Sequence, residues 1–272
     1  MKLEQVKEIT NKALEELATS LEGGQSEALT TYLKTMALFS KYSLNNLFLI
    51  AKQRPDARRV AGYQTWRKLG RFVRKGEKGI AIIAPLISRK TETENLDSME
   101  EQSVVRGFKV THIFSEQQTD GEPLPEIGSV TGDPGYFLCQ LEEFVRGNGI
   151  ELPYSDDIAP ARGMAEKGTI TLVHEQTAAE TFATLVHEVA HSEMHFGERR
   201  AETTKRIRET EAESVAFVVC SAIGLETGTA AQDYVGLYGG DSKLLLESLQ
   251  YIQQTANRIL FAISPQTLTT PA

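Results

Sequence analysis

The sequence contains a His-Glu-x-x-His motif, formed by His187, Glu188 and His191, inside an apolar run that suits a helix. Residues four apart on a helix share one face, so the two imidazoles can converge on a single cation. Glu188 then lies beside the first imidazole, where it can act on a metal-bound water. The chain has only five histidines, so a chance match is rare. The motif predicts a metal site, with Zn²⁺ expected and Mn²⁺ or another divalent ion as the alternative.

A catalytic zinc usually has three protein ligands, so the motif needs a further one. Glu209 and Glu213 are four residues apart in the next predicted helix and share a face, whereas Glu211 points ~200° away from Glu209. We expect Glu209 to be the third ligand and Glu213 to accept a hydrogen bond from a ligand imidazole, with Glu211 as the alternative ligand. His195 is too far along the helix to share the ion, and we interpret it as a helix-end or cleft-lining residue.

This donor set predicts a zinc metallopeptidase of the gluzincin type. The metal would lower the pKa of its bound water, and Glu188 would take the proton and pass it to the leaving amine. Tyr234 and Tyr238 are the nearest tyrosines in sequence that could stabilise an oxyanion, and their spacing selects neither.

A second kind of chemistry is indicated by a basic segment in an acidic chain. Residues 51–90 hold twelve lysines and arginines against two acids, which gives this segment a net charge of +10. Because the whole chain has a net charge of −8, the remaining residues together carry −18. Single-stranded nucleic acid binds where cations follow the backbone and aromatic rings stack on bases. The candidate DNA-binding residues in and before this segment are Tyr42, Asn45, Asn46, Arg54, Tyr63, Trp66, Arg67, Lys68, Arg71, Arg74, Lys75 and Lys78.

The elements that must position these residues follow from periodicity and from turn residues. Apolar spacing predicts helices over residues 2–20, 27–53, 136–145, 202–223 and 242–263, and strands over 80–84, 107–114 and 168–173. Thr177 and Glu180 form a capping box at the start of the motif helix, and the strand before it offers an edge for an extended peptide. Residues 123–134, rich in proline and glycine, suggest a boundary near residue 130. We predict an α+β protein of two domains, residues 1–130 and 131–272.

Composition bounds the cellular context. The first residues are charged throughout, and no apolar run reaches the ~18 residues that a membrane span requires. Cys139 and Cys220 each lie in an apolar segment, as expected for free thiols rather than a disulfide. These observations predict a cytoplasmic protein without a membrane partner.

Four sequence blocks carry a resemblance to a known family. Residues 42–46 (YSLNN), 62–66 (GYQTW), 70–80 (GRFVRKGEKGI) and 114–121 (FSEQQTDG) resemble the N-terminal single-stranded-DNA-binding domain of ArdC-type antirestriction proteins, a domain also found in plasmid TraC-type primases. The His-Glu-x-x-His motif followed by Glu209-x-x-x-Glu213 resembles the zincin-type metallopeptidase domain of the same family. The resemblance implies a mixed α/β DNA-binding domain followed by a zincin-like domain that contains the motif helix.

The resemblance also implies a function. The chain is expected to bind single-stranded DNA, and double-stranded DNA as well, and to protect incoming conjugative DNA from host restriction. The metal domain would act by cleaving DNA-associated proteins. In the alternative, the protein shields DNA or blocks a restriction enzyme, and its metal site is not proteolytic.

Overall fold

The computed structural model describes residues 3–23, 26–90, 102–122, 132–225 and 241–264, which form two compact units. Unit 1 comprises Met1–Leu14 and Asn45–Leu124, and unit 2 comprises Glu15–Leu44 and Pro125–Ala272. The predicted division is linear, whereas residues 15–44 cluster with the second unit. The predicted boundary near residue 130 lies outside the described residues. The prediction of a mixed helical and strand protein is confirmed.

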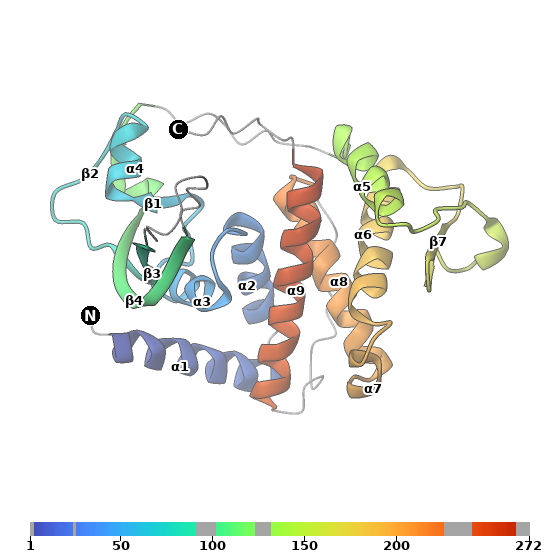
Figure 1. Cartoon of the computed structure of the whole chain (residues 1–272), viewed down its shortest axis with the longest axis horizontal. Coiled ribbons are helices and arrows are strands. Elements are labelled where there is room, and N and C mark those ends of the chain that lie inside the picture. Colours follow the sequence, from blue (N-terminus) through green and yellow to red (C-terminus); the bar gives the residue numbers. More distant parts are fainter. Residues whose placement is uncertain (1–2, 24–25, 91–101, 123–131, 226–240, 265–272) are drawn as a thin grey trace, which may run out of the picture. The chain divides into compact units, whose positions relative to one another are not determined.

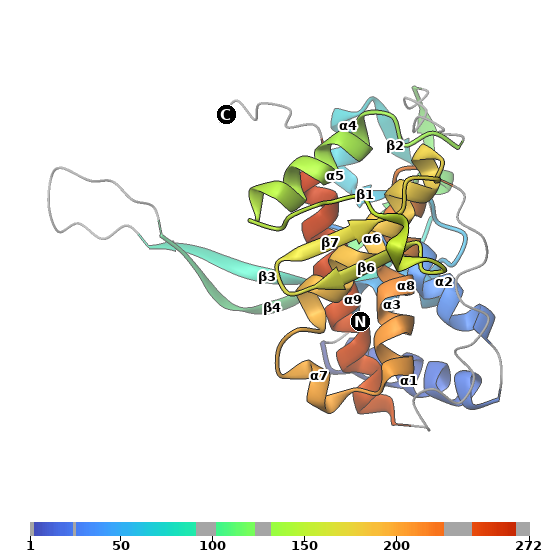
Figure 2. The same ribbon diagram turned by 90° about the vertical axis from the view of Figure 1, so that its right-hand side faces the viewer.

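Unit 1 is built on a three-stranded antiparallel sheet in the order β1-β4-β3. Strands β3 and β4 continue as a long ribbon that projects beyond the rest of the unit (Figure 2). A second sheet pairs β2 with β5, joined to β4 by the short helix η1. The elements of this unit are β1 (Val60–Gly62), α4 (Tyr63–Lys68), β2 (Arg71–Val73), β3 (Ile80–Lys90), β4 (Gln102–Ser115), η1 (Glu116–Gln118), β5 (Thr119–Gly121), most of α3 (Leu44–Gln53) and the first part of α1 (Leu3–Glu22).

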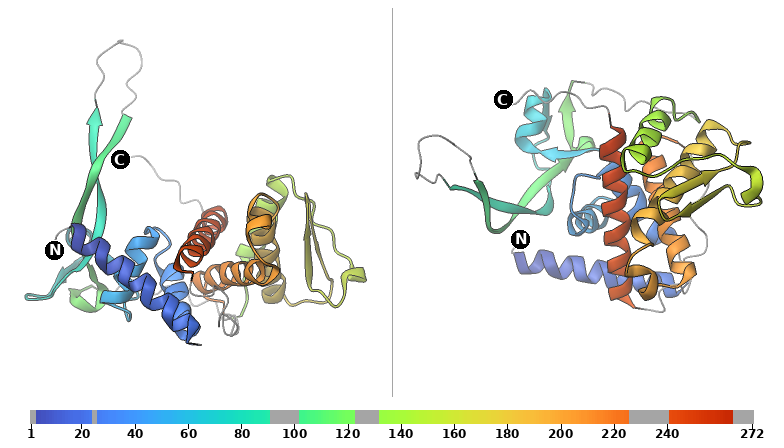
Figure 3. Two further views of the ribbon diagram at one scale, coloured as in Figure 1. Left: turned by 90° about the horizontal axis from the view of Figure 1, so that it is seen from below. Right: turned by 45° about the vertical axis from the view of Figure 1, so that its right-hand side comes forward.

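Unit 2 is a helical bundle with a small sheet. Helix α6 lies between the two-stranded β6–β7 sheet and helices α8 and α9 (Figure 3). Apolar side chains of all three helices fill the core, among them Phe182, Val215 and Ile252. The elements of this unit are α2 (Ser26–Leu38), α5 (Tyr136–Gly147), η2 (Asp156–Ile158), β6 (Gly163–Glu166), β7 (Thr169–Leu172), α6 (Ala178–Met194), α7 (Arg199–Glu202), α8 (Lys205–Ala222) and α9 (Ser242–Ile263).

The single helix predicted over residues 27–53 is wrong, because the chain turns between α2 and α3 (Figure 1). The Tyr42 N–H donates to the Phe39 carbonyl at 2.9 Å, which closes the turn. Serines at positions 40 and 43 flank it, and serine side chains favour turns and caps over helix interiors. None of the described helices is both long enough and apolar enough to cross a membrane.

Candidate metal centre

Helix α6 begins at a capping box and presents the His-Glu-x-x-His motif from its second half. The Thr177 hydroxyl accepts from the Glu180 N–H, and the Glu180 carboxylate accepts from the Thr177 N–H at 2.9 Å. These bonds satisfy two of the amide groups that a helix start leaves without partners. Apolar side chains on the inner face, including Leu185, Val186 and Val189, anchor the helix in the core. The motif is therefore held on a rigid element.

Three side chains from α6 and α8 form a triangle of donor atoms. The Nε2 atoms of His187 and His191 lie 3.0 Å apart, and Glu209 Oε2 lies 3.6 Å from the first and 3.4 Å from the second. Ligands about 2.0–2.1 Å from a tetrahedral zinc are separated by about 3.3 Å. Within the described residues, this is the one His, Cys, Asp and Glu cluster whose ligand atoms lie close enough to share an ion. The structure thus places Glu209, and neither Glu211 nor Glu213, beside both imidazoles.

The protonation states of these groups suit cation binding. Burial, helped by the nearby charge of His187, lowers the pKa of His191 to about 4, which leaves the imidazole neutral at pH 7. Hydrogen bonding from His187, aided by the nearby His191, lowers the pKa of Glu209 to about 2, so its carboxylate is ionised. Metal ligands must be deprotonated to bind, and these two side chains already are at neutral pH.

Glu188 is buried beside this triangle. Desolvation raises the pKa of its carboxyl, although the charge of His187 and a hydrogen bond from the Ala165 N–H act in the opposite direction. A carboxyl whose pKa is raised is a better general base at physiological pH. Tyr234 and Tyr238, the two tyrosines considered for oxyanion stabilisation, lie outside the described residues.

Strand β6 passes so close to Glu188 that a Cβ at position 163 would require neighbouring side chains to shift. A Cβ on Gly163 would lie 2.8 Å from Glu188 Cγ, 2.9 Å from Glu188 Oε1 and 2.6 Å from Thr184 Cγ2. The close approach brings the β6 backbone against the carboxylate and fixes its position. Sequence analysis missed this strand, and the only available signal was the glycine itself.

Glu213, the residue that we predicted to support a ligand imidazole, is exposed. Instead, the Nδ1 atoms of His191 and His195 are 2.8 Å apart, and His195 Nε2 lies 2.9 Å from Glu211 Oε2. The face of α8 that packs inward holds Glu211 with Ser214 and Val215, about 200° from Glu209. Glu213 shares the face of Glu209, one turn further along the helix. His195 ends helix α6, as predicted, but it is buried and does not line a cleft.

The candidate DNA-binding residues fall into exposed, paired and buried groups. The exposed group retains the features expected of a nucleic-acid surface, because it combines cations with an aromatic ring. Phe72, an aromatic residue near these cations in sequence, is also 58% exposed. The exposed candidates are Asn45, Tyr63, Arg67, Lys68, Arg74, Lys75 and Lys78.

Two of the candidates are core residues and are not available to DNA in this structure. Trp66 is 2% exposed, and its indole Nε1 donates to the Phe114 carbonyl at 2.9 Å. The Asn46 side-chain amide donates to the Ile83 carbonyl and accepts from the Ile83 N–H, both at 2.8 Å. These two side chains hold β4 and β3 to the neighbouring helices. Aromatic and amide composition cannot distinguish such roles from base contacts.

The remaining candidates are partly engaged inside their own units. Arg71 joins β2 to β5 by donating to the Thr119 hydroxyl at 2.9 Å and the Thr119 carbonyl at 3.0 Å. Arg54 lies 3.7 Å from Glu77, which also pairs with the exposed Arg74. Tyr42 belongs to unit 2, where its carbonyl accepts from a glutamine of α9.

Comparison with known proteins shows what the chain is similar to. Residues 4–115 match the model for the N-terminal domain of anti-restriction factor ArdC. The metal-free crystal structure of antirestriction ArdC from the R388 plasmid aligns with a TM-score of 0.53 and 20% identity, covering 93% of this chain and 97% of that one. Residues 4–115 are therefore similar to the ArdC N-terminal domain, and the chain shares the two-domain fold of the R388 protein.

Two further similarities were found. The Mn(II)-bound crystal structure of the same R388 protein aligns with a TM-score of 0.47 and 20% identity, covering 82% of this chain and 89% of that one. An uncharacterized protein of Bacillus anthracis is 25% identical over 310 residues, which cover 96% of this chain and 52% of the relative. The chain thus spans about half the length of this relative.

Proposed function

We propose that this chain is a DNA-binding antirestriction protein whose second unit carries a metal-dependent peptidase centre. The observation that carries the proposal is the triangle of His187, His191 and Glu209, with the buried Glu188 beside it. An imidazole pair with a carboxylate is the donor set of gluzincin-type sites, and its spacing suits a tetrahedral ion such as Zn²⁺. Mn²⁺ is the second candidate, because nitrogen and oxygen donors also bind it.

The side chains around the triangle would divide the work of amide hydrolysis. When bound, a divalent ion supplies a water of lowered pKa and polarises a carbonyl. Glu188 would accept a proton on its carboxylate and return it to the leaving amine, while the Ala165 N–H holds that carboxylate in place.

A substrate in extended conformation would find an edge at β6. The edge of β7 that the sequence suggested is covered, because the Ile170 N–H donates to the Glu151 carbonyl at 2.8 Å. Among the described residues, β6 pairs only with β7 (Figure 2). A Cβ on its Gly163 would lie 2.8 Å from Glu188 Cγ, so the strand runs beside Glu188. Main-chain pairing at such an edge binds peptides with little dependence on side chains. We therefore propose β6 as the strand that holds a protein substrate.

The first unit would supply recruitment to DNA. Its exposed lysines and arginines can neutralise phosphates, and Tyr63 and Phe72 offer open aromatic faces on which bases stack. This surface suits single-stranded DNA, and its cations would also attract duplex DNA. A protein met on that DNA, such as a restriction enzyme, is the proposed substrate of the peptidase centre.

The test is Glu188→Gln, with Glu175→Gln as a matched control at an exposed glutamate just before α6. The proposal predicts that Glu188→Gln keeps Zn(II) content and DNA affinity but loses protection of transferred unmethylated DNA against a host restriction enzyme. The control should retain all three properties.

Full protection by Glu188→Gln, with metal and DNA binding intact, would contradict proteolysis. That result would support the alternative, in which the protein shields DNA or blocks the restriction enzyme without cleaving it.

A further inference from the structure

A buried chain of hydrogen-bonded polar side chains starts at the candidate metal ligands, and the proposed peptidase chemistry does not use it. We propose that His195 and Glu211 are positioning residues, which hold the His191 imidazole in the orientation and tautomer that bind the metal. The inference rests on the proposed metal centre and deepens it.

The hydrogen-bonded side chains form a continuous series from helix α6 to helix α9. The Nδ1 atom of His191 lies 2.8 Å from Nδ1 of His195, and His195 Nε2 lies 2.9 Å from Glu211 Oε2. The carboxylate of Glu211 then contacts the guanidinium of Arg199 and the hydroxyl of Ser248, which donates at 2.5 Å. Three segments of unit 2 therefore converge on a carboxylate of a fourth, helix α8.

Burial makes this arrangement costly unless every polar group is satisfied. The exposed fractions of His195, Glu211, Arg199 and Ser248 are 1%, 0%, 5% and 0%. A carboxylate in such a place loses several kcal/mol of hydration, and an apolar side chain of similar volume would avoid that loss. The carboxylate has partners on both oxygens, so the cluster is paired throughout. A fully connected polar cluster specifies one arrangement of the side chains that it joins.

The hydrogen-bond chain assigns one proton to each link. If Nε2 of His191 faces the ion, its Nδ1 carries the proton and donates to Nδ1 of His195. His195 must then carry its own proton on Nε2, from which it donates to the ionised carboxylate of Glu211. Both imidazoles are neutral in this scheme, and the negative charge of Glu211 is balanced by Arg199.

This arrangement adds one residue to the usual hydrogen bonding of a metal-bound imidazole. Metal-bound imidazoles usually donate their second N–H directly to a carboxylate or a carbonyl, which fixes the ring and raises its basicity. Here a second imidazole is interposed, because His195 stands at the end of α6 and faces α8. Its main-chain N–H also bonds to the His191 carbonyl at 2.9 Å, so its backbone is fixed relative to the ligand.

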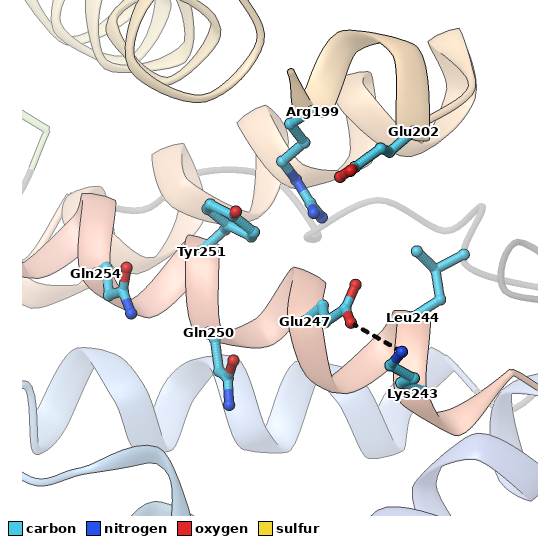
Figure 4. A pocket seen from close by; sticks show the side chains of 8 residues that line it. All are labelled: Arg199, Glu202, Lys243, Leu244, Glu247, Gln250, Tyr251 and Gln254. Carbon is cyan, nitrogen blue, oxygen red and sulfur yellow. Dashed lines mark ion pairs between the residues drawn. The ribbon is translucent and has the colours of Figure 1, made fainter. Parts of the chain in front are cut away.

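Arg199, the outermost residue of this hydrogen-bonded series, lines a cavity of about 580 Å³ between α7 and α9 (Figure 4). The guanidinium of Arg199 lies over the Tyr251 ring, 4.0 Å from its centroid, and this contact keeps the arginine directed at Glu211. Glu247 lines the same cavity and lies 3.9 Å from Lys243, away from the buried chain. Glu247→Gln therefore changes the cavity without touching the residues under test.

Two substitutions at His195 separate the two links of the chain. His195→Asn places an amide oxygen near the position of Nδ1, so it can still accept from His191 while losing Glu211. His195→Gln places its amide near the position of Nε2, so it can still donate to Glu211 while losing His191. A role in packing alone would affect both variants alike, whereas positioning of the ligand should affect His195→Gln more.

The measurement is Zn(II) affinity by chelator competition, with the Co(II) absorption spectrum as a readout of ligand geometry. We expect His195→Gln to bind Zn(II) about 10–100-fold more weakly than the unchanged protein. The Co(II) spectrum of this variant should also be altered. His195→Asn should show a smaller loss, and the Glu247→Gln control should match the unchanged protein in both measurements.

A second measurement needs no substitution and no metal. Long-range ¹H–¹⁵N spectra of the metal-free protein report which ring nitrogen of each histidine is protonated. The proposal predicts Nδ1–H for His191 and Nε2–H for His195, and the reverse tautomer at either ring would overturn it.

The outcomes distinguish this inference from the proposed function. Unchanged Zn(II) affinity and Co(II) spectrum in a folded His195→Gln variant would overturn the positioning role while leaving the metal centre intact. Failure of the unchanged protein to take up Zn(II) or Mn(II) would overturn both.

Discussion

Three glutamates spaced two residues apart on α8 have three different environments. Glu209 meets the imidazoles of α6, Glu211 is enclosed among buried polar groups, and Glu213 faces solvent. A step of two residues turns the side chain by about 200°, which separates Glu211 from Glu209, whereas Glu213 lies on the face of Glu209 one turn further along. At this scale, the environment of a side chain depends on which face of its helix is packed.

The close approach of strand β6 to Glu188 gives a prediction about Gly163. Gly163→Ala should destabilise the protein by about 1–3 kcal/mol, because the added methyl would overlap Thr184 and Glu188. The variant that remains folded should also lose peptidase activity, because the displaced group is the proposed base. Denaturant unfolding measures the first effect.

The control for this change is Gly197→Ala, where an added Cβ would meet nothing within 4 Å. Equal unfolding midpoints for the two alanine variants would show that β6 does not press on Glu188.

At the scale of elements, helix α6 depends on its first turn to present the motif. A backbone hydrogen bond from Thr177 lowers the pKa of the exposed Glu180, which also lies 3.0 Å from Arg162. The capping box is thus an ionic contact as well as a geometric one, and its strength should depend on pH.

The pH dependence of this cap has a definite sign. Because the pKa of Glu180 is lowered on folding, its contribution is complete above the ordinary glutamate value of about 4.3 and is lost as pH falls through the lowered value. Glu180→Ala should therefore be less stable than the unchanged protein at pH 7, and the difference should shrink below pH 4. Glu180→Gln, which keeps an acceptor for the Thr177 N–H, should lie between them. A difference that stays constant from pH 7 to pH 3 would contradict the ionic contribution.

In unit 1, Trp66 joins α4 to β4 and so belongs to the core. Trp66→Ala should cost about 3–5 kcal/mol, as for other buried aromatic side chains. Any loss of DNA affinity in this variant would then be caused by unfolding, which circular dichroism measures.

Phe72→Ala provides the comparison, because that ring is exposed. It should leave the unfolding temperature nearly unchanged while weakening single-stranded DNA binding by about 1–3 kcal/mol. Equal stability of Trp66→Ala and Phe72→Ala would contradict the core role of the tryptophan.

At the scale of the whole molecule, the two chemical features lie in different compact units: the exposed cations in unit 1 and the donor triangle in unit 2. Each unit has its own core, as the buried Trp66 and Phe182 illustrate. DNA binding and metal binding should therefore be separable by substitution.

Replacing Lys68, Lys75 and Lys78 together with alanine tests this separation. The variant should bind single-stranded DNA more weakly, and its log–log salt slope should fall in magnitude by about 2. Its metal content should be unchanged. Conversely, His187→Ala should lose metal and keep DNA affinity.

The control for the triple change is Lys7→Ala with Lys12→Ala, on the exposed side of α1. An equal loss of DNA affinity in this pair would show that net charge, and not the basic segment, determines binding.

Much of this organisation was determined by the sequence alone. The periodic apolar spacing predicted helix α9 at the bounds observed, and the Thr177 capping box placed the start of α6. The motif itself predicted that His187 and His191 share a face, because a spacing of four residues on a helix leaves no other arrangement. These are local properties, and local physics decides them.

Only the tertiary structure decided which distant groups meet these local elements. The packing of α8 on α6 brought Glu209 to the imidazoles and Glu211 to His195, and strand β6 reached Glu188 through a glycine. Packing within unit 1 buried Trp66 and Asn46, which composition had suggested as DNA contacts. The sequence specifies the type of each side chain directly, but the burial and the partners of that side chain arise when separate elements pack together.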